Sequence, residues 1–122
     1  MAEDHNLILA SRVEHTPVFN EDGWLIGHIK DISIDRESGE AIYVIVSFGG
    51  FLGFGTRLHP IPWHLLTYDT GKQGYVAPLD EESLKDAPHF EASELENFGG
   101  AHPAESRTHI FDYYGPYAAP PI

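Results

Sequence analysis

Carboxylates and histidines are the side chains of this sequence that could carry acid–base or metal chemistry. The chain has 19 acidic residues and 8 histidines among its 122 residues. Asp31 and Asp35 lie four residues apart on a predicted strand. At about 3.3 Å per residue they stand ~13 Å apart, too far to share a proton or to flank a glycosidic bond. We therefore expect structural roles, in which Asp35 begins a turn and Asp31 accepts backbone hydrogen bonds.

The histidines do not have the spacing of a metal site. His59 and His64 flank the segment Pro60 to Trp63, whereas His102 and His109 lie near the C-terminus. The sequence has no His-Glu-x-x-His motif and no closely spaced triplet of ligands. We expect scattered surface and turn histidines, and neither a metal ion nor another cofactor. The alternatives are a weak metal site, weak collection of Ca²⁺ or Mg²⁺ by the acidic surface, and a pH-sensitive surface.

The sequence contains no recognisable residue or motif for nucleophilic catalysis. The chain contains no cysteine, which excludes a thiol nucleophile, a disulfide and a cysteine-based zinc site. It also lacks a Gly-x-Ser-x-Gly elbow, and Ser47 lies inside an apolar strand. A Ser–His–Asp triad assembles in space, so spacing alone does not exclude one. We predict no catalytic residues and no enzymatic activity.

The segment from Gly49 to Gly55 is the most unusual stretch. It places three large apolar residues, Phe51, Leu52 and Phe54, among four glycines. No Gly-Lys-Ser/Thr sequence follows it, so it is not a phosphate-binding loop. One interpretation is an apolar tip that docks on a protein partner or on a second copy of the chain. The other is that these side chains fold back over an open end of the protein's own core.

Aromatic residues near the C-terminus form a second group of candidate contacts. Tyr113, Tyr114 and Tyr117 cluster beside Phe111. This aromatic density argues against disorder, so we expect the tail to dock, either on its own domain or on a neighbour. Trp63 ends a predicted strand, where it either plugs the core or supplies a further contact.

The net charge of the chain excludes some classes of binding partner. The 19 acidic residues face 7 basic ones, a formal net charge of −12. This balance argues against direct binding to nucleic acid and against docking on an anionic membrane. The longest apolar run, Ala41 to Val46, has six residues, against about 20 for a membrane-spanning helix. Since the N-terminus has no signal-peptide pattern, we expect a cytoplasmic protein without membrane insertion.

Short strands separated by turns must position these residues. The predicted strands cover Pro17–Asn20, Leu25–Asp35, Ala41–Phe48 and Thr56–Ile61, followed by a turn at 62–66 and a hairpin around Thr70–Gly74. In the second strand, Ile29 is out of phase with Ile26 and Ile32, which indicates a bulge or bend next to Gly27. The third strand is apolar in both phases, which predicts that both of its faces are covered. A short helix capped by Asp80 follows. Together these elements indicate an all-β protein built as a small closed barrel, with a short helix and a C-terminal tail.

Several short motifs follow one another in a fixed order along the chain. They are Ser11-Arg12-Val13, Pro17-Val18, Gly23, Gly27, Asp31, Asp35, Gly39, the run Val46–Gly55, Ile61-Pro62-Trp63, Leu66-Thr67-Tyr68, Pro88 and Phe90. In order and spacing they resemble the PRC-barrel family, and the ending Asp112–Tyr117 is similar to a tail of its stand-alone bacterial members. Two positions differ from the family pattern. His15 stands where the family often has glycine, and Ala118 to Pro121 replace a tryptophan that commonly ends the tail.

The resemblance implies a six-stranded PRC-type β-barrel over residues 7–90, followed by an acidic and aromatic tail over residues 91–122. In the family, this domain forms part of the H subunit of photosynthetic reaction centres and the C-terminal domain of a ribosome maturation factor, where it contacts a ribosomal protein. A ribosomal connection could still run through a basic protein, toward which an acidic surface steers. The shared property is docking on other macromolecules. We therefore expect a non-enzymatic adaptor that binds a protein partner or a second copy of itself as a homodimer. The alternative is a barrel that binds a small ligand or metal ion without catalysis. The candidate contact residues are Phe51, Leu52, Phe54, Trp63, Tyr113, Tyr114 and Tyr117.

Overall fold

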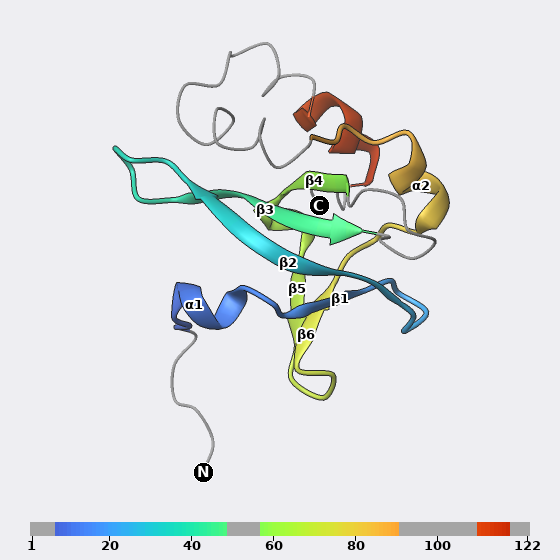
Figure 1. Ribbon diagram of the computed structural model, residues 1–122, viewed down its shortest axis with the longest axis horizontal. Coiled ribbons are helices and arrows are strands. Elements are labelled where there is room, and N and C mark those ends of the chain that lie inside the picture. The colour runs from blue at the N-terminus through green and yellow to red at the C-terminus, as the bar shows by residue number, and fades with distance from the viewer. Residues whose placement is uncertain (1–6, 49–56, 91–109, 118–122) are drawn as a thin grey trace, which may run out of the picture.

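Six strands form one curved sheet in the computed structural model, which describes residues 7–48, 57–90 and 110–117 (Figure 1). The strands are β1 (Pro17–Phe19), β2 (Leu25–Ile34), β3 (Ala41–Phe48), β4 (Arg57–Pro62), β5 (Thr67–Asp69) and β6 (Gly74–Val76). The helical elements are α1 (Ala10–Val13), η2 (Trp63–Leu65), α2 (Glu81–Lys85) and η3 (Gly115–Tyr117), and residues 110–114 are also helical. The predictions of a mostly-β fold and of a short helix after Asp80 are confirmed.

The strand order is β4-β3-β2-β1-β6-β5. Neighbouring strands pair antiparallel, except β1 and β6, which run parallel. Strands β4 and β5 lie at the two edges, and within the described residues no backbone hydrogen bonds join them to each other. The structure therefore contains the six predicted strands as a sheet that hydrogen bonds do not close into a barrel.

The long strand β2 bends where the sequence predicts it. Val18 of β1 pairs with Gly27 and Phe19 pairs with Leu25, so Ile26 is an extra residue on β2. Two further register shifts occur between β2 and β3. Because each bulge increases the local twist, β2 can contribute to two curved halves of the same sheet. The predicted bulge next to Gly27 is confirmed.

The core is centred on β3. Four consecutive residues of this strand, from Tyr43 to Val46, are at most 4% exposed, which confirms that both faces of the strand are covered. The helical residues 110–114 belong to the same core, since Ile110 is 0% and Tyr114 is 1% exposed. The ring of Phe111 lies 5.5 Å from that of Tyr43, centre to centre. The described part of the tail therefore packs on its own chain.

Aspartate carboxylates accept backbone N–H groups at three places: in the turn after β2, within β2 itself and at the start of α2. The Asp35 carboxylate accepts the N–H groups of Glu37 and Ser38, and the Asp31 carboxylate accepts the N–H of Ile32. Asp80 caps α2 by accepting the N–H of Ser83 at 2.8 Å. The structural roles predicted for Asp31 and Asp35 are confirmed, since both carboxylates accept backbone N–H groups of residues close to them in the chain.

His15 adopts a left-handed backbone conformation, with φ of 71°, and its N–H donates to the carbonyl of Ile29 at 2.6 Å. A residue with a Cβ is strained there, whereas glycine is not. We expect His15→Gly to raise the free energy of unfolding by about 0.5–1 kcal/mol, measured by urea denaturation. The control is Glu14→Gly, because Glu14 has an ordinary φ of −61° and glycine there only adds unfolded-state entropy. A loss of stability in His15→Gly would contradict the strain argument.

Candidate interaction surface

The turn between β1 and β2 presents the most exposed aromatic side chain of the described residues. Trp24 is 73% exposed, and Leu25, the next residue, is 54% exposed. The turn that carries them is well bonded: the Asn20 side-chain oxygen accepts the N–H groups of Asp22 and Trp24, and the Asn20 N–H donates to the Trp24 carbonyl. Gly23 supplies the positive φ of 92° that this turn needs. Trp24 is thus held outward on an ordered hairpin.

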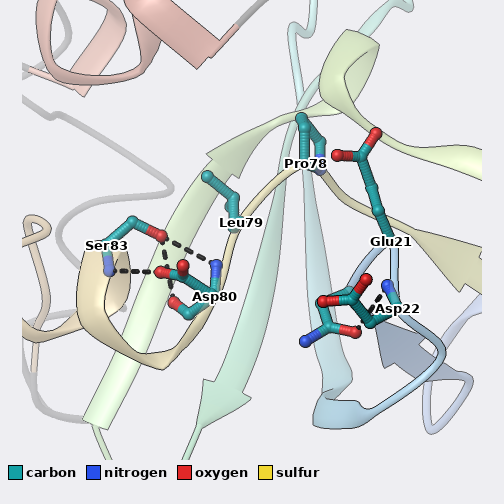
Figure 2. Close-up of a pocket in the computed structure, with 7 residues that line it drawn as sticks. Glu21, Asp22, Pro78, Leu79, Asp80 and Ser83 are labelled. Carbon is teal, nitrogen blue, oxygen red and sulfur yellow. Dashed lines mark hydrogen bonds between the residues drawn. The ribbon is translucent and has the colours of Figure 1, made fainter.

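A shallow acidic groove of about 150 Å³ lies beside this turn, between it and the start of α2 (Figure 2). The groove is lined by Asn20, Glu21, Asp22, Pro78, Leu79, Asp80 and Ser83. Its three carboxylate residues, Glu21, Asp22 and Asp80, are all exposed. Hydrogen bonding from Ser83, first through its backbone N–H and then through its side chain, lowers the pKa of the Asp80 carboxyl. The groove is therefore anionic at neutral pH, and none of the described residues that line it is basic.

Trp63 belongs to an aromatic row at the corner between η2, β5 and β6. Its ring lies 5.7 Å from that of Tyr75, which in turn lies 5.1 Å from that of Tyr68. Tyr75 is buried and Tyr68 is 45% exposed, while Trp63 is half-buried. Burial, and then the neighbouring Tyr68, raise the pKa of Tyr75. Trp63 therefore packs against the core with part of its surface accessible, and its role as a contact stays a prediction.

The other predicted contact residues occupy different positions. Tyr113 and Tyr114 lie together, with an edge-to-face ring contact at 5.1 Å. Tyr114 points into the core, and the half-buried Tyr113 donates its hydroxyl to the Ser83 carbonyl of α2. Tyr117 ends η3. The predicted tip formed by Phe51, Leu52 and Phe54 lies outside the described residues.

The expectation that the histidines lie on the surface or in turns is wrong for His59. This residue is 0% exposed, because β4 is covered by β3 on one side and by Phe90 on the other. The structure holds no group of three or more potential metal ligands among residues 7–48, 57–90 and 110–117. In the same ranges, no helix is both long and apolar enough to cross a membrane.

A bent six-stranded sheet with one core and an exposed tryptophan beside an acidic groove defines a small, mostly-β domain. A family model for the PRC-barrel domain matches residues 5–84, and the chain belongs to this family. Comparison with curated proteins gives no match.

Trp24 was not among the candidate contacts predicted from the sequence. This residue directly follows the Glu-Asp-Gly turn, and a tryptophan at that place was the available sign of an outward contact.

Proposed function

We propose that this PRC-barrel domain is a non-enzymatic protein-interaction module that docks a basic protein on the β1–β2 turn. The exposure of Trp24 is the observation that carries the proposal. Tryptophan contributes more than most residues to binding energy at interfaces, and burying it against a partner removes a large apolar surface from water. Leu25 adds a second apolar side chain at the same site.

The acidic groove specifies the chemistry of the partner. Glu21 and Asp22 belong to the same turn as Trp24, and Asp80 lines the other side of the groove with its carboxylate turned toward Ser83 (Figure 2). A basic side chain of the partner could pair with the carboxylates of the groove, while an apolar side chain of the partner packs on Trp24. The net charge of −12 steers a basic protein toward the domain from a distance.

Further parts of this proposal rest on the chain's sequence and family. We infer that the domain works in the cytoplasm, self-associates as a homodimer, and uses Phe51, Leu52 and Phe54 together with the aromatic row at Trp63 as additional contacts. In this proposal the six-stranded sheet curves into a barrel. Side chains, and not backbone hydrogen bonds, fill the gap between its edge strands β4 and β5. These inferences are independent of the contact at Trp24 and can fail separately.

Pulling down partners with matched variants tests the contact at Trp24. We expect the double variant Trp24→Ser/Leu25→Ser to lose at least ~90% of a specific basic partner captured by the wild type, as expected when an aromatic hot spot is removed. Ile34→Ser is the control, because Ile34 is 50% exposed at the opposite end of β2. Binding should also weaken as salt rises, since the groove contributes charge.

Two outcomes would contradict this assignment. Equal capture by the wild type and the double variant would remove the β1–β2 turn from the interface. If the protein is recovered without a partner, the docking proposal fails and only the inferred self-association is left. Light scattering of a companion variant, Phe51→Ser/Phe54→Ser, and of the wild type tests self-association. If the molecular mass of the variant falls to that of a monomer, the glycine-rich segment is responsible for self-association.

A further inference from the structure

His59 is a buried titratable side chain that the proposed interface does not use. It is 0% exposed, and among the described residues neither of its ring nitrogens has a hydrogen-bond partner. Its ring contacts the edge of Phe48 at 6.0 Å and the ring of His89 at 5.6 Å, centre to centre. A buried imidazole that makes no hydrogen bond is tolerated only while it is neutral, because a buried charge without an acceptor is far more costly.

The residue next to His59 holds a distant segment on the sheet. Leu58 donates its N–H to the Phe90 carbonyl at 3.1 Å and accepts the Phe90 N–H at 2.8 Å. This pair joins β4 to residues 88–90, which follow α2 directly. The Leu58–Phe90 pair thus holds the segment that places the His89 ring against His59.

The groups that face His59 oppose its protonation. Burial is the main cause, followed by the charge of His89 on the segment after α2 and that of Arg57 on the same strand, and together they lower the pKa of His59 to about 4. The Pro88 carbonyl acts in the opposite direction, although its geometry lies outside that of a hydrogen bond. Strand β3 contributes the uncharged ring of Phe48.

We propose that His59, Leu58 and the segment 88–90 form an acid-sensitive latch, in which protonation of His59 releases Phe90 from β4. Opening the latch exposes the imidazole to water, which can hydrate its charge, and separates it from His89 and Arg57. The opened form binds the proton more tightly than the closed form, so acid shifts the equilibrium toward opening. The latch is closed at pH 7 and is loosened as the pH falls from about 6.5 toward 4.

Hydrogen exchange followed by NMR on the full chain tests the latch. Between pH 7 and pH 5, we expect the protection factors of the Leu58 and Phe90 amides to fall about twentyfold, given a pKa of 6.5 in the opened form and about 4 in the closed form. The amide of Ile29, two strands away from β4, donates to the Thr16 carbonyl on the β1 side of β2, so it is the internal reference and should keep its protection.

Three variants separate the latch from general acid unfolding. His59→Phe removes the titrating group and should abolish the pH dependence at Leu58 and Phe90. His89→Gln leaves His59 in place but removes a charge that opposes its protonation, so it should reduce the loss of protection at low pH. This variant provides the test if His59→Phe does not fold. His28→Gln removes an exposed histidine of β2 and should change nothing. Equal loss of protection at Ile29, or a pH dependence that survives in His59→Phe and is unchanged in His89→Gln, would overturn the proposal.

Discussion

Replacing Tyr114 by alanine is expected to lower the free energy of unfolding by about 3–5 kcal/mol. The side chain is 1% exposed and shares the core of the strands, so its removal leaves a cavity of aromatic size. A domain of this length is stable by about 5–15 kcal/mol in total, so the loss is a large part of what holds the fold. Urea denaturation followed by fluorescence measures it.

The neighbouring tyrosine provides the matched control. Tyr113→Phe keeps the ring and loses only the hydroxyl that donates to the Ser83 carbonyl, which predicts a loss of about 1 kcal/mol. If the tail docked on a second copy of the chain instead, Tyr114→Ala would reduce the dependence of the unfolding midpoint on protein concentration. A Tyr114→Ala protein as stable as the wild type would show that the tail does not complete this core.

Much of the sheet follows from local features that the sequence displays. The bounds of β3 coincide with the predicted strand Ala41–Phe48, and the slip in phase between Ile26 and Ile29 marks the extra residue on β2. Asp35 and Asp80 mark a turn and a helix start because each carboxylate bonds to backbone N–H groups within three residues. Such interactions depend only on neighbours in the chain, so the sequence shows them directly.

The features that the sequence did not reveal depend on distant partners. His59 is buried because Phe90, some thirty residues further on, pairs with Leu58, and Tyr114 is buried because the tail returns to the sheet. Helix α1 spans only Ala10–Val13, and no side chain caps its start, so it has neither periodicity nor a start motif. Composition indicates that the tail docks, but the choice between its own core and a neighbour's depends on contacts across the whole chain.

We expect an added methyl group to disturb the pairing of β2 with β3 more at Gly27 than at any other residue of the two strands. A Cβ built there would lie 2.5 Å from the carbonyl oxygen of Ser47 and 2.9 Å from a methyl carbon of Val46. The Ser47 oxygen belongs to the backbone of β3 and cannot move without disturbing the ladder where Gly27 pairs with Phe48. We expect Gly27→Ala to lower the free energy of unfolding by about 3 kcal/mol, at the upper end of the cost of overpacking.

Gly115→Ala is the matched control for this substitution. A Cβ on Gly115 would meet no atom of the described residues within 4 Å, so the change should alter stability by less than about 0.5 kcal/mol. Both variants lose the same unfolded-state freedom on gaining a methyl group, so the difference between them isolates the clash with β3. Urea denaturation of the two proteins measures this difference. A Gly27→Ala protein within 0.5 kcal/mol of Gly115→Ala would mean that β2 and β3 separate at this pair without cost, and the bend in β2 would then need another explanation.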